Sequence, residues 1–383
     1  MKTKRIFIIF TIFLFLSLSI LSTTSFADNN EISTYSPHCI LIEASTGKII
    51  YEKDAYTPVP PASTTKIMTA ILTLEHCNLT DTATVSHDAI FTVPLGYSHA
   101  NLVEGEVLTI DQLLHVLLIP SANDAANVWA EHIAGSINSF TTMMNTKALE
   151  LGCQNTNFVN TNGLPVDNHY TTAYDIALMS RELLKHETIS KYLTTWMDSV
   201  VVGKKQATIG IANTNKMVKH YQGTTGVKTG FTQQAKYCLS ASAKRGDTHL
   251  VAVTLGAETS PERFKDSSAL LNFGFANYES VKLCSKNDNI SALTLDKAED
   301  NKINLVAKDD LSVLIKKGGA KDFNRKVKLK QDITLPIKKG TTLGVVEIYS
   351  GDKLIGKVDL VNTKDVNKAS YLQMLQRVIN QMI

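Results

Sequence analysis

The spacing of hydrophobic residues along the chain predicts a region that mixes helices with a sheet. Between residues 62 and 76, apolar side chains such as Ile67, Ala70 and Leu74 recur at helical intervals. Pro60-Pro61 just before them favours a helix start. Further helical patterns occur at 110–119, 124–134, 140–151, 173–184 and 261–275, and strand-like runs at 39–42, 48–51, 237–243 and 249–255. Helices together with strand hairpins indicate the α/β class.

The pattern changes after about Tyr278, where short apolar runs are broken by Asn, Asp, Lys and Gly. This texture predicts a small all-β domain at 278–368, following an α/β domain at 28–277. The last residues, 369–383, form an amphipathic helix pattern whose apolar face holds Leu372, Leu375, Ile379, Met382 and Ile383. Such a helix either lies at a membrane surface or packs on the β domain, and its pattern alone does not separate these cases.

The N-terminus has the pattern of a signal peptide. Lys2, Lys4 and Arg5 precede an uncharged, mostly apolar run over 6–21, and Ser25-Phe26-Ala27 supplies small residues for cleavage before Asp28. We therefore predict a signal peptide at 1–27 and an exported mature protein. The alternative is an uncleaved membrane anchor.

Charge and cysteine content exclude several classes of function. Loss of the signal peptide would delete three of the 39 basic residues and none of the 36 acidic ones, so the mature chain is close to neutral and nucleic acid is not an expected partner. The five cysteines have no CxxC spacing and an odd number, which argues against a disulfide framework. The ten histidines show no HExxH or similar ligand spacing, so we predict neither a metallopeptidase nor a cofactor.

The pattern Ser-x-x-Lys occurs three times, and one copy has the placement of a nucleophile with its base. The copies that start at Ser45 and Ser350 lie in predicted turns between strands, where residues three apart need not share a face. Ser63 lies at the predicted start of a helix, so the amine of Lys66 can reach its hydroxyl. The amine must be neutral to accept a proton, which requires burial or a nearby cation. Lys228 is the candidate for that cation.

Two further short motifs follow in the chain. Ser121-Ala122-Asn123 comes directly after the apolar helix pattern that ends at Pro120, and Lys228-Thr229-Gly230 is the only Lys-Thr-Gly present. Each motif alone is better explained by a turn or a helix cap than by a functional site. Ser-x-x-Lys, Ser-x-Asn and Lys-Thr-Gly in this order, however, match the motif set of β-lactamases and penicillin-binding proteins.

The stretches 61–70, 118–126 and 226–232 resemble D-alanyl-D-alanine carboxypeptidases, the low-molecular-mass penicillin-binding proteins. The resemblance extends over essentially the whole mature chain, because Pro336-Ile337-Lys338-Lys339-Gly340 is also similar to the β-rich C-terminal domain of that family. It implies a β-lactamase/transpeptidase-like catalytic domain, with an antiparallel sheet and a helical cluster. It also implies that the terminal helix contacts the outer face of the cell membrane.

The same resemblance implies a substrate and a role for each motif. The substrate is the peptidoglycan stem peptide that ends in D-Ala-D-Ala, cleaved through an acyl-enzyme on Ser63, and β-lactams are the expected inhibitors. The implied roles are Lys66 as general base, Ser121 as proton relay and Asn123 as ligand of the substrate amide; the backbone N–H groups of Ser63 and Phe231 as oxyanion hole; and Lys228, Thr229 and Gly230, with Arg263, as the site of the terminal carboxylate. For Arg263 a solvated position at a helix start is the alternative.

Departures from the family pattern and competing activities leave alternatives open. Asn162 stands where many relatives have the histidine of His-Gly-Leu, and Tyr174 replaces a common arginine, so the rate of deacylation is in doubt. A class A β-lactamase would add a Glu-x-x-Leu-Asn segment, which the sequence lacks between Ser121 and Lys228. A noncatalytic scaffolding protein is disfavoured by the intact Ser63 and Lys66.

Overall fold

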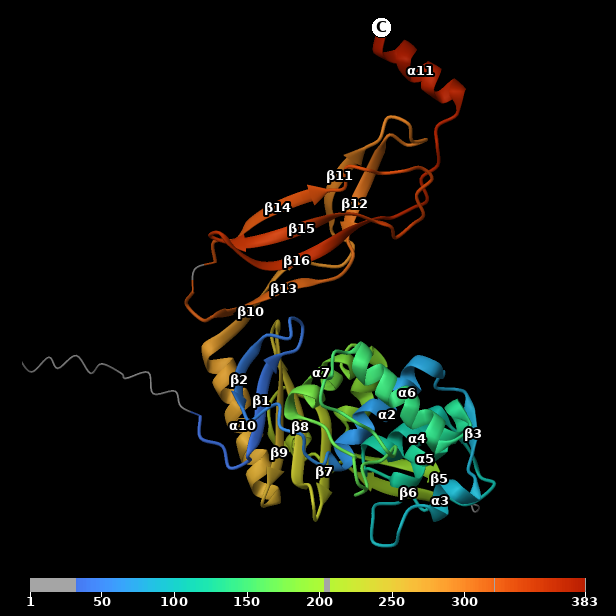
Figure 1. The fold of residues 1–383 in the computed structure, drawn as a ribbon, viewed down its shortest axis with the longest axis vertical. Helices are drawn as coiled ribbons and strands as arrows, with labels where there is room; N and C mark the ends of the chain where they lie inside the picture. Colours follow the sequence, from blue (N-terminus) through green and yellow to red (C-terminus); the bar gives the residue numbers. More distant parts are fainter. Residues whose placement is uncertain (1–31, 203–206, 320, 383) are drawn as a thin grey trace, which may run out of the picture. The chain divides into compact units, whose positions relative to one another are not determined.

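The computed structural model describes residues 32–202, 207–319 and 321–382, and its first part is built on a five-stranded antiparallel sheet (Figure 1). The strand order is β2-β1-β9-β8-β7. These strands are β1 (His38–Glu43), β2 (Ile49–Lys53), β7 (Thr224–Thr232), β8 (Lys236–Arg245) and β9 (Thr248–Ala257). The N-terminal hairpin thus pairs with strands that lie far away in the sequence, as shown by Ile40 of β1, which is opposite Val253 of β9. The predicted signal peptide lies outside the described residues.

Helices cover both faces of this sheet. On β9, Thr254 contacts Ser267 of α10 (Ser260–Asn277), whereas Ser240 of β8, the partner of Val253, contacts Ser180 of α7 (Ala173–Leu183). Neighbouring positions of a strand point to opposite faces, so α10 and α7 lie on opposite sides of the sheet, as Figure 1 shows.

The helical cluster lies on the α7 side and supplies most of the buried core. Its long helices are α2 (Lys66–His76), α4 (Ile110–Leu118), α5 (Asn123–Ala134) and α6 (Ile137–Glu150). Trp129 and Phe140 are fully buried where α5 and α6 pack together. The smaller elements are the 3-10 helices η1 (Ala62–Thr65) and η2 (Glu187–Ile189), the short helices α3 (His87–Phe91), α8 (Ser190–Leu193) and α9 (Met217–His220), and the strands β3 (Thr82–Thr84), β4 (Val107–Thr109), β5 (Met197–Val202) and β6 (Ala207–Ala212).

Local capping explains where several helices begin. Thr109 and Gln112 form a reciprocal capping box before α4, and Thr259 and Glu262 form another before α10. The helix predicted at 62–76 is instead two pieces, because residues 62–65 form η1 and the α-helix starts only at Lys66. Ala62, the first residue of η1, has a φ of +46°, which a helix interior does not accept, so a regular α-helix cannot extend back to residue 62.

The second part of the chain is all-β, as expected. Its larger sheet has the order β11-β12-β16-β15-β14, and β10 pairs with β13. Leu305, Val346 and Leu360 belong to its own apolar cluster. The strands are β10 (Tyr278–Cys284), β11 (Asn289–Thr294), β12 (Lys302–Ala307), β13 (Leu311–Lys316), β14 (Asn324–Leu329), β15 (Thr342–Ser350) and β16 (Lys353–Asn362).

The chain ends with α11 (Tyr371–Met382), which confirms the predicted terminal helix. Leu372, Leu375 and Ile379 on its apolar face are exposed. Among the described residues, none of the helices combines the length and apolar character needed to cross a bilayer.

All five cysteines are free thiols, and all but Cys77 are buried.

Replacing Leu117 of α4 by alanine is expected to destabilise the α/β part by about 2–5 kcal/mol, because the side chain is fully buried and leaves a cavity. Urea unfolding followed by tryptophan fluorescence measures this, since both tryptophans, Trp129 and Trp196, lie in this part. Leu149→Ala on α6, where the leucine is 73% exposed, is the matched control and is expected to change stability by less than about 0.5 kcal/mol. Equal shifts of the two midpoints would contradict the core assignment.

Candidate active site

Ser63 and Lys66 lie one helical turn apart at the junction of η1 and α2. The Nζ of Lys66 is 2.8 Å from the Oγ of Ser63. Ser63 is partly exposed, whereas its neighbours Ala62 and Thr64 are buried. The serine hydroxyl is therefore accessible from solvent, and the amine approaches it from the buried side.

The amine of Lys66 is enclosed by groups that hold it in place. It is fully buried and donates to Oδ1 of Asn123 at 2.6 Å and to the carbonyl of Asn162 at 3.1 Å. Both partners are acceptors only, so in the neutral amine they take its two N–H groups and leave the lone pair for the proton of Ser63. Burial first, and then the charge of Lys228, hold the pKa of Lys66 well below its usual value, with Asp124 acting in the opposite direction.

The Ser-x-Asn motif forms the turn between α4 and α5. Ser121 has a φ of +70°, a left-handed conformation that is rare for serine, and its side chain is mostly buried. Asn123 is the first residue of α5, and its carboxamide oxygen is occupied by Lys66. The Nδ2 of Asn123 makes no hydrogen bond within the described residues and is available to a ligand. Within the described residues Ser121 makes no direct hydrogen bond to Ser63 or Lys66, and the two motifs meet through Asn123.

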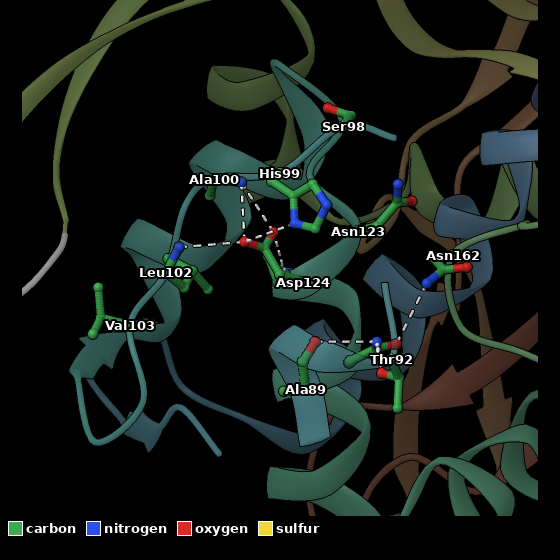
Figure 2. Close-up of polar contacts among 12 residues, drawn as sticks. Ala89, Thr92, Ser98, His99, Ala100, Leu102, Val103, Asn123, Asp124 and Asn162 are labelled. Atoms are coloured by element: carbon green, nitrogen blue, oxygen red, sulfur yellow. Dashed lines mark hydrogen bonds and ion pairs between the residues drawn. The ribbon is translucent and has the colours of Figure 1, made fainter. Parts of the chain in front are cut away.

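A buried carboxylate next to this motif anchors a neighbouring loop, as Figure 2 shows. Asp124 accepts hydrogen bonds from the backbone N–H of Ala100 at 3.0 and 3.1 Å and from that of Leu102 at 3.3 Å. In the same loop, Ser98 accepts from the N–H of Asn123 and donates its hydroxyl to the carbonyl of Pro120. The loop therefore holds the strained turn at Ser121 from one side. Sequence reasoning missed Asp124, although it directly follows the Ser-x-Asn motif.

The segment around Asn162 contacts the amine of Lys66 and the backbone of η1. The backbone carbonyl of Asn162 accepts a hydrogen bond from Lys66. The side-chain Oδ1 of Asn162 accepts from the N–H of Leu164, and its Nδ2 lies 3.5 Å from Oδ1 of Asn127. Gly163 has a φ of +88°, and a Cβ there would lie 1.8 Å from the carbonyl oxygen of Ala62. The backbone of this segment thus takes part in the site, and the Asn162 side chain is used to hold the loop. Tyr174 instead packs its ring against Tyr56, with centroids 5.2 Å apart.

The Lys-Thr-Gly motif lies on β7, directly against the nucleophile. A Cβ at Gly230 would lie 2.9 Å from the backbone nitrogen of Ser63, so only glycine allows this approach of strand and 3-10 helix. Lys228 and Thr229 are almost fully buried. Burial, with a smaller contribution from the charge of Arg263, lowers the pKa of Lys228 to about 7. Phe231 is 45% exposed, and its ring lies 4.3 Å from that of Tyr237.

Arg263 is buried, and the alternative of a solvated helix-start residue is wrong. Its Nη1 donates to the carbonyl of Gly230 at 2.8 Å and to that of Cys238 at 3.1 Å. These two residues face each other across β7 and β8, so the guanidinium links the strands at the end of the Lys-Thr-Gly motif. Arg263 therefore influences Lys228 through its charge and also holds the strand that carries Lys228.

Comparison with known proteins identifies the family. The sequence profile of the D-alanyl-D-alanine carboxypeptidase family matches residues 24–259, and that of the penicillin-binding protein 5 C-terminal domain matches residues 278–368. The chain belongs to the D-alanyl-D-alanine carboxypeptidase family. This confirms the resemblance on which the sequence analysis relied.

Individual relatives match over most of their length. The D-alanyl-D-alanine carboxypeptidase DacF of Bacillus subtilis is 34% identical over 91% of this chain and 90% of its own. Penicillin-binding protein 5 from Haemophilus influenzae is similar in structure, with a TM-score of 0.71 and 27% identity over 88% of this chain and 98% of its own. The Streptomyces K15 DD-transpeptidase has a TM-score of 0.61 and 31% identity, and covers 64% of this chain and 100% of its own.

One group among the described residues has metal-ligand character, and none of the motif residues belongs to it. Glu75, Glu182 and His186 bring their ligand atoms within 4.8 Å of one another. Glu75 pairs with Lys147 and Glu182 with Lys185, each at 2.6 Å. Lysine amines therefore already neutralise both carboxylates.

Replacing Lys228 by glutamine is expected to raise the pKa of Lys66, because a cation that disfavours the charged amine is lost. With Lys66 as the base, as the sequence predicts, only its neutral amine accepts the Ser63 proton, and acylation is expected to rise with pH through the pKa of Lys66. The rising limb of the acylation rate, measured with a fluorescent penicillin over a series of buffers, should therefore move to higher pH. Lys236→Gln, which removes an exposed charge on β8, should leave the limb in place. A limb that stays or moves to lower pH in Lys228→Gln would refute this coupling.

Proposed function

We propose that the chain is a serine-type D-Ala-D-Ala carboxypeptidase that removes the terminal D-alanine from peptidoglycan stem pentapeptides through an acyl-enzyme on Ser63. The observation that carries the proposal is the 2.8 Å contact between Ser63 and a buried lysine whose other hydrogen bonds end on acceptors. This arrangement gives a serine hydroxyl a base of lowered pKa. Membership of the family supplies the substrate class.

Acylation starts with proton transfer from Ser63 to the neutral amine of Lys66. The alkoxide attacks the carbonyl of the penultimate D-alanine, and the backbone N–H groups of Ser63 and Phe231 stabilise the oxyanion. A donor of this kind typically lowers the barrier by about 3–4 kcal/mol. The proton then passes, with Ser121 as relay, to the amine of the departing D-alanine. Water hydrolyses the ester on Ser63 and restores the hydroxyl.

Substrate recognition in this proposal uses both sides of the site. The free Nδ2 of Asn123 binds the peptide carbonyl of the substrate, since the oxygen of Asn123 is held by Lys66. The terminal carboxylate binds at Lys228 and Thr229 beside Gly230. Arg263 contributes its charge to this site, while its Nη1 supports the strand that carries the motif.

Benzylpenicillin is expected to form a stoichiometric adduct on the mature protein, because the β-lactam presents a strained amide to the same hydroxyl. Intact mass spectrometry detects this adduct, and release of D-alanine from a stem-peptide analogue measures the activity. Ser63→Ala should abolish both.

Ser45→Ala is the matched control, because Ser45 belongs to another Ser-x-x-Lys copy. In that copy Ser45 donates to Glu43, and Lys48 binds the carbonyl of Leu314. This variant should still form the adduct. A wild-type protein that forms no adduct and leaves the drug intact would favour a noncatalytic scaffold. No adduct with rapid drug hydrolysis would indicate a β-lactamase.

We propose that the N-terminal and C-terminal segments of the chain direct the enzyme to the outside of the cytoplasm. Residues 1–27 act as a signal peptide, residues 28–277 form the catalytic domain and residues 278–368 the β-rich domain. Residues 369–383 contact the membrane peripherally through the exposed apolar face of α11. The support for this contact is that Leu372, Leu375 and Ile379 remain exposed although they form one face.

Leu375→Glu with Ile379→Glu is expected to abolish cosedimentation of the mature protein with anionic phospholipid vesicles, because charge on the apolar face prevents its burial. Gln373→Glu with Asn380→Glu adds the same charge outside that face and should retain most of the binding. Equal loss in both variants would attribute binding to charge alone, and vesicle binding by neither variant nor wild type would exclude the contact.

A further inference from the structure

Thr214 touches both sides of the site, although no motif includes it. It lies between β6 and α9. Its backbone N–H donates to the carbonyl of Ile119 at 3.2 Å, two residues before Ser121. Its Oγ1 lies 2.5 Å from the Oγ1 of Thr229 in the Lys-Thr-Gly motif. Thr214 therefore joins the turn of the Ser-x-Asn motif to the strand of the Lys-Thr-Gly motif.

The residues on either side hold Thr214 in this position. Asn213 is buried; its N–H donates to the carbonyl of Trp196 at 2.8 Å, and its Nδ2 donates to that of Thr195 at 3.0 Å. Asn215 is also buried, and its N–H donates to the side chain of Asn213 at 2.9 Å. The backbone at Thr214 is thus held on both sides by hydrogen bonds of buried neighbours.

The hydrogen bond between the two hydroxyls can form with either one as the donor, and the choice decides whether Thr229 offers a ligand a proton or only lone pairs. It is the only hydrogen bond that either hydroxyl makes within the described residues. Each hydroxyl has one proton. If Thr229 donates to Thr214, Thr229 offers only lone pairs to the site. If Thr214 donates to Thr229, the proton of Thr229 is free to donate to a ligand. A carboxylate is an acceptor only, so it selects the second direction.

We propose that Thr214 is a positioning residue that holds the Thr229 hydroxyl with its proton directed at the terminal carboxylate of the substrate. The inference rests on the proposed function, because it requires that this carboxylate binds at Thr229. Thr214 does not touch the reacting atoms. It acts on recognition of the free C-terminus, and so on the choice of a substrate with a terminal carboxylate over one without.

Thr214→Val keeps the β-branched shape and removes the hydroxyl, so it tests the role directly. For an acyl-D-Ala-D-Ala peptide, KM should rise about fivefold, with kcat little changed, because Thr229 keeps its own proton but loses the neutral hydrogen bond that orients and polarises its hydroxyl. For an ester analogue whose leaving group is an uncharged alcohol, neither constant should change. Thr214→Ser retains the hydroxyl and should restore the wild-type KM.

The same series separates this inference from the proposed function. Thr229→Val should show a loss confined to the carboxylate substrate, and the penicillin adduct checks that each variant retains an intact nucleophile. If Thr214→Val impairs both substrates equally, or neither, the positioning role is overturned while the carboxypeptidase activity stands. A wild type that releases no D-alanine overturns the proposed function and this inference together.

Discussion

The burial of one lysine amine is the constraint on which the site depends. Lys66 lies where water does not solvate its charge, and its two acceptor partners, Asn123 and the carbonyl of Asn162, leave one direction free toward Ser63. A charged ammonium is disfavoured there by desolvation and by Lys228. The helix start, the Ser-x-Asn turn and the loop at Asn162 can be understood as the enclosure of this amine.

That enclosure is assembled from close backbone contacts and strained residues. Gly163 lies against Ala62 and Gly230 against Ser63, at distances that leave no room for a side chain. Ala62 and Ser121 have positive φ angles, which cost stability and persist only where surrounding contacts hold them. Asp124 and the loop at Ser98 provide such contacts for Ser121. The core of α4, α5 and α6 therefore supports an arrangement that the local sequence does not favour.

Three buried basic side chains, Arg263, Lys228 and Lys66, influence one another across the site. Arg263 holds the ends of β7 and β8 together. Burial first, and then the charge of Arg263, lowers the pKa of Lys228, and burial first, and then the charge of Lys228, lowers that of Lys66. A negatively charged substrate entering next to Lys228 would favour the charged form of that lysine. The hydrogen bond between Thr214 and Thr229 lies in the same motif and, as proposed, orients a neutral donor beside these charges. In the proposed function, recognition of a C-terminal carboxylate and preparation of the nucleophile thus both involve Lys228.

The sequence alone predicted most of the long helices and strands, because their hydrophobic periodicity is local, and it identified the family through motifs whose order is distinctive. It pointed to Ser63, Lys66 and Lys228 as partners. Only the tertiary structure decided that the helix at Ser63 begins with a 3-10 turn, that the carboxamide oxygen of Asn123 accepts a hydrogen bond from Lys66, and that Arg263 is buried. It alone brought Asp124 and Thr214 into the site. These features arise from contacts between residues far apart in the chain, where steric fit and burial override local preference, and no spacing rule records them.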